Sequence, residues 1–212
     1  MIRHVIWDWN GTLVNDVDLC VDILNQVLAA HCLQPISLNQ YRKTFFFPVA
    51  RFYQTLGLPS SGPHYEKLAG DYIQAYRERF KECGLNPGAL ENVRALSDLG
   101  VSQSILSAGA QQDVENFVSF YQLDRLVFWI DGANNVEANG KGDRAIDHLS
   151  RLDCEAKEVL LIGDTLHDLE VANLLGCQCL LYSGGHTDEL KLLKATHHII
   201  RSLSELAEWV HD

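Results

Sequence analysis

An acidic residue directly follows an apolar run near the start of the chain. The segment Val5–Thr12 reads VIWDWNGT, so Asp8 ends the run and Gly11 permits a tight turn. A carboxylate here could act as a nucleophile or bind a metal ion, because open α/β sheets bind ligands at the carboxyl ends of their strands. Two positions later stands Asn10, whose amide can hold a hydrogen bond but cannot transfer a proton.

Three further polar segments follow predicted strands. Because the carboxyl ends of parallel strands meet at one edge of a sheet, we expect all of these segments to converge there. They would bring together a nucleophile, a hydroxyl group, backbone N–H groups, an ammonium group and two more carboxylates. That combination suits phosphoryl transfer assisted by Mg²⁺. The three segments are Ser107-Ala108-Gly109, Gly140-Lys141-Gly142 and Asp164 with Asp168.

The elements that must position these residues alternate between strand and helix. Short apolar runs predict the strands, and apolar residues at helical spacing predict the helices. Alternation of this kind is typical of parallel βαβ units, so the sequence predicts an α/β fold with a Rossmann-like parallel sheet. The expected strands are 2–7, 102–107, 126–129, 158–162, 178–182 and 197–200, and the expected helices after residue 87 are 88–99, 111–120, 142–151, 167–175, 187–194 and 202–210.

Between the first strand and Pro87 only helical patterns occur. They cover 15–33, 38–45, 48–56 and 64–83, and turn residues separate them. We therefore expect an α-helical cap domain at 16–86, inserted into an α/β core domain that is formed by 1–15 and 87–212.

Composition restricts the classes of partner. The 212 residues are 47% hydrophobic, which suffices for a sizeable core, and the formal net charge is −11. An acidic surface repels nucleic acid, so we expect no nucleic-acid partner. No stretch approaches the roughly 18 apolar residues of a membrane span, and the start lacks the pattern of a secretory signal. We expect a cytoplasmic protein without a membrane partner, as a monomer or homodimer.

In this order, the four polar segments resemble the four motifs of the haloacid dehalogenase (HAD) superfamily: an apolar run with D-x-D-G-T, a strand ending in Ser or Thr, a Lys, and G-D-x-x-x-D. The helical insertion resembles the C1-type cap of its phosphoglycolate phosphatase-like members. The resemblance covers the whole chain. It implies a HAD-like core and a Mg²⁺-dependent hydrolase that acts on a small phosphorylated metabolite through an aspartyl-phosphate.

The resemblance also implies roles for individual residues. Asp8 would attack phosphorus, and Asn10 would occupy the position of the family's acid/base residue. The transferring phosphate would be bound by Thr12, Ser107, Ala108 and Lys141. The Mg²⁺ ligands would be Asp8, the backbone carbonyl of Asn10, Asp164 and Asp168.

Asn10 departs from the family pattern, which has an aspartate at that position, and alternatives follow from it. The chain could be a phosphate-binding regulatory protein that is slow or non-catalytic. It could also be a hydrolase of the phosphonatase or dehalogenase type, since those branches lack the second aspartate too. If it is a phosphatase, His167, which lies between the two acids of the last motif, could shuttle the proton.

The predicted cap holds the candidates for specificity. Arg42, Lys43 and Arg51 could contact a distal anion of the substrate. The aromatic residues within 45–53 are expected mainly to pack between cap helices, because their spacing is helical.

Overall fold

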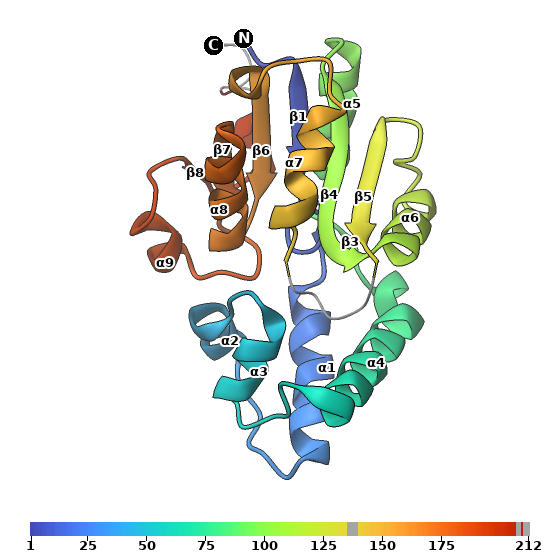
Figure 1. Cartoon of the computed structure of the whole chain (residues 1–212), viewed down its shortest axis with the longest axis vertical. Helices are drawn as coiled ribbons and strands as arrows, with labels where there is room; N and C mark the ends of the chain where they lie inside the picture. The colour runs from blue at the N-terminus through green and yellow to red at the C-terminus, as the bar shows by residue number, and fades with distance from the viewer. Residues whose placement is uncertain (135–139, 207–208, 210–212) are drawn as a thin grey trace.

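A six-stranded parallel sheet forms the centre of the molecule (Figure 1). The computed structural model describes residues 1–134, 140–206 and 209. In spatial order, the strands are β5 (Trp129–Ala133), β4 (Ser102–Ala110), β1 (His4–Trp7), β6 (Val159–Gly163), β7 (Gln178–Tyr182) and β8 (Ile199–Ile200). The α/β fold with a Rossmann-like parallel sheet is thus confirmed.

Strand β1 is fully buried between two neighbours. In the parallel register, Trp7 lies opposite Ile105 of β4 and Ile162 of β6. The next residue, Asp8, donates its backbone N–H to the Ile162 carbonyl at 2.8 Å, so the chain leaves the sheet directly at this carboxylate. A strand with both faces covered needs apolar side chains throughout, which explains the continuous apolar run.

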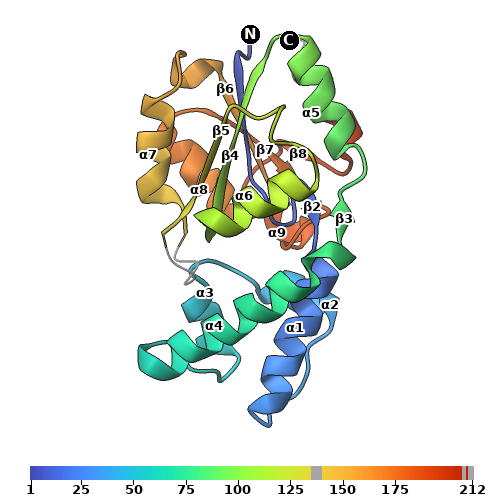
Figure 2. The same cartoon turned by 90° about the vertical axis from the view of Figure 1, so that its right-hand side faces the viewer.

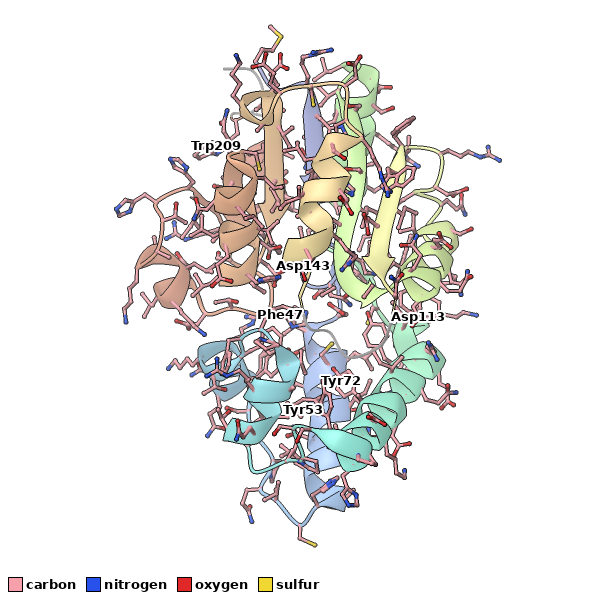
Figure 3. All side chains as sticks on the ribbon, in the orientation of Figure 1. Phe47, Tyr53, Tyr72, Asp113, Asp143 and Trp209 are labelled. Carbon is pink, nitrogen blue, oxygen red and sulfur yellow. The ribbon has the colours of Figure 1, made fainter. Side chains whose placement is uncertain are left out.

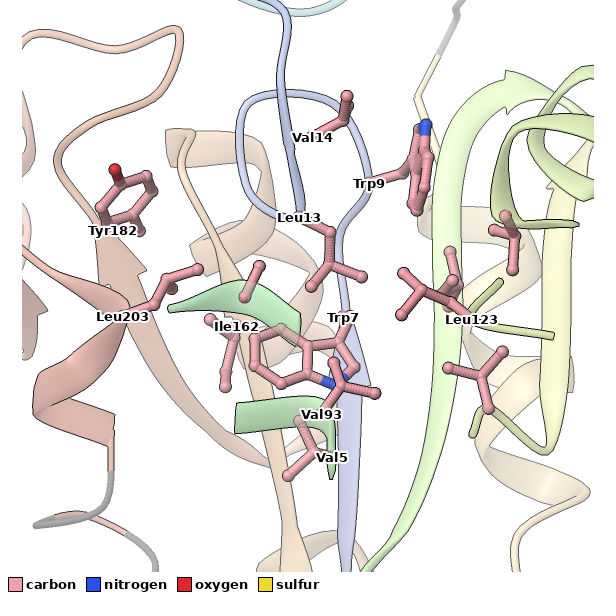
Figure 4. Packing of buried hydrophobic residues seen from close by; sticks show 14 of the residues in the cluster. Val5, Trp7, Trp9, Leu13, Val14, Val93, Leu123, Ile162, Tyr182 and Leu203 are labelled. Carbon is pink, nitrogen blue, oxygen red and sulfur yellow. The ribbon is translucent and has the colours of Figure 1, made fainter. Parts of the chain in front are cut away.

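Helices cover both faces of the sheet (Figure 2). Alternate residues of β1 point to opposite faces: Val5 and Trp7 pack with residues of α5 and α6, and Ile6 packs with residues of α7 and α8. Figure 4 shows Trp7 against Val93 of α5 and Ile162 of β6. The helices are α5 (Ala89–Asp98), α6 (Gln111–Phe120), α7 (Gly142–Ser150), α8 (Leu166–Leu175) and α9 (Glu189–Leu193), with 3₁₀ turns η2 (Ala156–Glu158) and η3 (Leu203–Leu206).

A helical unit lies beyond the carboxyl edge of the sheet (Figure 1). Many of its apolar side chains, such as Leu28, Phe52 and Leu68, form a core separate from the two on the faces of the sheet. The inserted helical cap is therefore part of the observed architecture, while the domain limits 16–86 stay a prediction. The unit contains α1 (Val17–Ala30), α2 (Leu38–Thr44), α3 (Val49–Thr55), α4 (Gly62–Arg79) and η1 (Phe80–Glu82).

The chain enters and leaves the helical unit through two short antiparallel strands, β2 (Val14–Asn15) and β3 (Gly84–Leu85). The sequence pattern did not predict them, because two residues are too few to show alternation. Beside them, the Asn86 amide donates to the carbonyls of Gly11 and Thr12 at 3.0 and 2.9 Å. The connection to the helical unit thus also braces the turn after Asp8.

Two predicted elements are wrong or incomplete. The strand predicted at 126–129 begins only at Trp129, because the chain turns at 124–126 and Phe128 is 76% exposed. Its apolar residues belong to the link before the edge strand. Of the helix predicted at 202–210, the structure has the 3₁₀ turn at 203–206, and 207, 208 and 210 lie outside the described residues. Within the described residues, no helix is both long and apolar enough to cross a membrane.

One buried histidine on β1 predicts how stability depends on pH. His4 is 2% exposed and hydrogen bonds with Ser102 and Ser104 of β4 at 2.6 and 2.7 Å. Burial, helped by nearby His148, lowers the pKa of His4 to about 4 from an ordinary 6.5. The unfolded chain therefore binds more protons between these pH values, and stability falls as pH drops through this window. From pH 7 to 5 the expected loss is about 2 kcal/mol.

Urea unfolding of the native chain and His4→Gln at pH 7 and pH 5 measures this contribution. The variant should lose less stability on acidification, by about 2 kcal/mol. The exposed control His64→Gln should behave like the native chain. An equal loss in the native chain and His4→Gln would contradict the assignment.

Candidate active site

Loops from three neighbouring strands bring the predicted site residues together. Asp8 follows β1 and Asp164 follows β6, which adjoin in the sheet, while Ser107 lies within β4 on the other side of β1. Lys141 stands at the N-terminus of α7 and Asp168 in the first turn of α8. The predicted convergence of the polar segments at one edge is therefore observed.

Three buried carboxylates lie close together at this edge. Oxygens of Asp8, Asp164 and Asp168 all lie within 4.8 Å of one another. The Thr12 hydroxyl donates to Asp164 at 3.0 Å, and the Thr165 hydroxyl and backbone N–H donate to Asp168 at 2.7 and 2.9 Å. The last pair forms a capping box at the start of α8, so Asp168 is held by the helix end itself.

The Lys141 ammonium lies among these carboxylates. Its Nζ atom is 2.6 Å from Asp8 Oδ1 and 2.5 Å from Asp168 Oδ1, and it donates to the Leu106 carbonyl at 3.0 Å. Because an ammonium has three N–H donors, each can serve one of these partners. The two carboxylates raise the pKa of the ammonium above its usual range, although burial alone would lower it. Lys141 therefore stays charged and offsets part of the local negative charge.

The charges in this cluster do not balance. Burial raises the pKa of Asp8 in spite of the neighbouring ammonium, and it raises that of Asp164 strongly. The pKa of Asp168 is lowered, because Lys141 and Thr165 outweigh its burial. Among the described residues, Lys141 is the one Lys or Arg side chain that contacts any of the three carboxylates, and it contacts Asp8 and Asp168. The donor set, hard anionic oxygens with surplus charge, fits a divalent cation such as Mg²⁺.

The Asn10 side chain is held by an acid that the sequence analysis did not single out. Asn10 Nδ2 donates to Asp16 Oδ2 at 2.6 Å and to the Tyr76 hydroxyl at 3.1 Å. The same carboxylate accepts from the Tyr76 hydroxyl and from the Gly11 backbone N–H, both at 2.8 Å. His186, followed by the Asn10 and Tyr76 donors, lowers the pKa of Asp16 against the effect of burial. An amide at position 10 thus matches an ionised Asp16, to which it donates a hydrogen bond.

His186 is the second residue that the sequence analysis missed. Its Nε2 atom is 3.4 Å from Asp16, its Nδ1 atom hydrogen bonds with the Tyr41 hydroxyl at 2.9 Å, and its backbone N–H donates to Asp164 at 2.5 Å. The sequence held one indication of its role. His186 follows the predicted strand 178–182, so it lies on a fifth loop that reaches the same edge of the sheet. Position 185 in that loop requires a glycine, because a Cβ atom there would overlap the Asp164 side chain.

Two predicted phosphate ligands lie beside this cluster. Ser107 is buried, its hydroxyl accepts from the Gly109 backbone N–H at 3.0 Å, and both residues line a cavity next to Asp8 together with Ala108. The Thr12 hydroxyl is engaged with Asp164 instead. Phosphate binding by Thr12, Ser107, Ala108 and Lys141 stays a prediction that this geometry is consistent with.

Four other candidates lie elsewhere. His167 Nε2 accepts the backbone N–H of Lys141 at 2.9 Å, so that nitrogen is not free to shuttle a proton. Arg42 donates to the Gly184 carbonyl at 2.8 Å, and Lys43 and Arg51 are exposed. None of the three cap cations lines the cavity, because their helices turn aromatic residues toward it.

The cavity has a volume of about 150 Å³ and lies between the carboxylates and the helical unit. Asp8, Asn10 and Ser107 line its end at the sheet, and aromatic residues of the helical unit line the rest. Figure 3 shows Phe47 at the junction between the two parts and Tyr53 and Tyr72 deeper in the helical unit. The aromatic residues of 45–53 both pack in the cap core, as predicted, and form the cavity wall.

Comparisons with known proteins agree with this arrangement. Phosphoglycolate phosphatase from Rhodobacter capsulatus is 20% identical over 190 residues, covering 88% of this chain and 86% of that protein. A 5'-nucleotidase from Pseudomonas aeruginosa is 26% identical over 206 residues, covering 92% and 90%. The crystal structure of a predicted phosphatase from Clostridium acetobutylicum shares the fold, with a TM-score of 0.81, 18% identity and coverage of 100% and 99%. A sequence model of the family described as haloacid dehalogenase-like hydrolase matches residues 5–182. The resemblance inferred from the four motifs is therefore confirmed, and the chain belongs to the haloacid dehalogenase-like hydrolases.

Proposed function

We propose that this hydrolase is a Mg²⁺-dependent phosphatase that acts on small phosphate monoesters through an aspartyl-phosphate on Asp8. The observation that carries the proposal is the position of Asp8. It faces the cavity and at the same time belongs to the buried cluster with Lys141, Asp164 and Asp168. The relatives named phosphoglycolate phosphatase and 5'-nucleotidase support this class of substrate.

In the proposed reaction, a carboxylate oxygen of Asp8 forms a bond to phosphorus while the bond from phosphorus to the ester oxygen breaks. The ester oxygen leaves with the bonding electron pair and takes a proton from water to become the alcohol. Water then hydrolyses the aspartyl-phosphate, which releases phosphate and restores Asp8. Ser107 and the backbone near Ala108 would hold the phosphate oxygens at the cavity end, with Lys141 and Thr12 beside them. Mg²⁺ held by Asp8, Asp164, Asp168 and the Asn10 carbonyl would supply positive charge between the carboxylates and the phosphate.

Asn10 sets the expected speed of this reaction. Its amide hydrogen bonds to Asp16 and cannot donate a proton to the leaving alcohol or take one from water. General acid/base catalysis contributes about 10²–10⁴-fold, so turnover should be slow by that factor for esters with poor leaving groups. The same feature keeps a slow phosphate-binding protein as the alternative function.

The phosphonatase-type alternative has less support. A Schiff-base mechanism needs a lysine at the reacting carbon, and none of the lysines among the described residues lines the cavity. Lys43 and Lys67 of the helical unit are exposed. For the rest, we propose a small-molecule partner, a cytoplasmic location, and a monomer or homodimer.

Two separate substitutions in the first motif, Asp8→Asn and Asn10→Asp, test the mechanism. With p-nitrophenyl phosphate and Mg²⁺, Asp8→Asn should reduce kcat to background, because it removes the nucleophile. Asn10→Asp should raise kcat by about 10²-fold, because a carboxylate there can transfer protons. It should also lower Tm, because the new carboxylate would lie within hydrogen-bond distance of Asp16.

Two outcomes of this assay distinguish the phosphatase mechanism from the slow phosphate-binding protein. Equal activity of the native chain and Asp8→Asn would contradict the role of Asp8. An inactive native chain with an active Asn10→Asp variant would establish the slow phosphate-binding protein instead. The intact mass of the native sample must be checked, because deamidation at Asn10-Gly11 would create the missing acid.

Thermal unfolding tests the metal site without reference to activity. Mg²⁺ at about 100 times its dissociation constant should stabilise the native chain by about 2.7 kcal/mol, which is a rise in Tm of roughly 5–10 °C. Asp164→Asn should show a much smaller rise, because it removes one anionic oxygen from the site.

The matched control is Asp98→Asn, which makes the same charge change at an exposed position on α5. It should keep the full Mg²⁺-dependent rise in Tm. If Mg²⁺ shifts Tm equally in the native chain and in Asp164→Asn, the cation binds elsewhere and the assignment of the metal site fails.

A further inference from the structure

The wall of the cavity next to Asp8 is mostly apolar. Nine of its 24 lining residues are Phe or Tyr, and Leu24, Val49, Ile73 and Val114 are among the others. Asp8 lines one end of this cavity, so a phosphate ester that reacts there while bound in the cavity places its alcohol portion against this wall. The composition of the wall therefore bears directly on which alcohols fit.

Most polar groups of the wall already have protein partners. The hydroxyl of Tyr76 donates to Asp16 at 2.8 Å, and that of Tyr72 donates to the Cys20 carbonyl at 3.4 Å. The Tyr41 hydroxyl is paired with His186, whose other ring nitrogen faces Asp16. These tyrosines thus present ring faces and edges to the cavity more than free hydroxyl groups.

Within the part of the chain that the structure describes, the wall offers no unpaired Lys or Arg to hold a second anion. Among the described residues, no Lys or Arg side chain lines the cavity. The second carboxylate that lines the cavity, Asp113, is paired with Arg77 at 2.8 and 2.9 Å, so that cation is already engaged. The His186 ring also lines the cavity, and its two nitrogens face Asp16 at 3.4 Å and the Tyr41 hydroxyl at 2.9 Å. A substrate carboxylate in this cavity would lose its hydration without gaining a charge partner, which is costly.

The size of the cavity limits the group that it can accept. Its volume of about 150 Å³ compares with engineered apolar cavities of about 150 Å³ that bind benzene. The phosphate would share this cavity at the end near Asp8 and Ser107, so one ring is the largest apolar group that fits beside it. Burying the apolar surface of such a ring is favourable by about 25 cal/mol per Å².

We propose that the preferred substrates are phosphate monoesters whose alcohol portion ends in one uncharged, apolar ring, aromatic or saturated. The inference rests on the proposed phosphatase function and names its substrate class. It sets this chain apart from its relatives named phosphoglycolate phosphatase, because a glycolate carboxylate finds no cation in this wall.

Two esters that differ only at the distal group test the proposal. Benzyl phosphate and phosphoglycolate both have a primary carbon attached to the ester oxygen, and they carry a phenyl ring and a carboxylate respectively. We expect kcat/KM to be at least about 10-fold higher for benzyl phosphate. An equal or higher kcat/KM for phosphoglycolate would overturn the proposal.

Binding of two non-reacting analogues separates this proposal from the phosphatase mechanism. Benzylphosphonate and phosphonoacetate carry the same two distal groups and cannot be hydrolysed at an ester bond. With Mg²⁺, benzylphosphonate should raise Tm more at equal concentration. If it does while no ester is hydrolysed, the phosphatase function fails and the apolar binding site stands. If phosphonoacetate raises Tm as much or more, the apolar site is refuted even in an active enzyme.

A charge placed in the wall provides the matched variant. Ile73 lines the cavity from α4 and is only half-buried, so Ile73→Lys can be accommodated. This variant should lower the ratio of kcat/KM for benzyl phosphate over phosphoglycolate by about 10-fold or more. Ile73→Leu, and Gln74→Lys at the exposed neighbouring position, should keep the native ratio. An unchanged ratio in folded Ile73→Lys would contradict the proposed position of the alcohol portion.

Discussion

The arrangement of the whole catalytic edge depends on how buried negative charge is tolerated there. Asp8, Asp164 and Asp168 meet out of water with one ammonium between them. Such a cluster is stable only if every remaining oxygen has a donor and if the backbone can approach closely. Gly11 and Gly185 are accordingly glycines, because a Cβ atom at either position would overlap the Asp164 side chain.

The same requirement explains how the helical unit is joined to the sheet. Asp16 lies just before α1, yet its side chain makes no cap hydrogen bond with that helix and turns back to the Gly11 backbone N–H. Asn86, just after the return strand, holds the other side of the turn through the carbonyls of Gly11 and Thr12. Both ends of the insertion therefore fix the loop that carries Asp8, so the geometry of this proposed nucleophile and the attachment of the cap are one structural feature.

This arrangement explains why an asparagine is suited to position 10. In the sequence it is a departure from the family pattern, but in the structure it is a donor to Asp16. The ionised state of Asp16 in turn is supported by Tyr76, Gly11 and His186. The position thus joins Asp16 to the aromatic wall of the cavity, since Tyr76 both donates to Asp16 and lines the cavity. A cavity that neutralises its own polar groups in this way is suited to an apolar ligand group.

Much of the fold and of the site could be predicted from local patterns. Buried parallel strands require apolar runs, so β1, β4, β6 and β7 were placed within a few residues, and the order of strands and loops led to Asp8, Ser107, Lys141 and the two later acids. Edge strand β5 was misplaced, because an apolar run before an edge strand looks like the strand itself. The two-residue strands β2 and β3 were too short to leave a pattern.

Contacts between residues far apart in the chain were decided only by the tertiary structure. His186 lies 170 positions after Asp16, and no periodicity or motif joins them. The roles of the cap residues were also undecided, since helical spacing is the same whether an aromatic ring packs in a core or lines a cavity. The sequence by itself determined which chemical groups reach the edge of the sheet, because strand ends follow from hydrophobic pattern. The tertiary structure decided their partners and the apolar wall opposite them, because these depend on how two separately packed units meet.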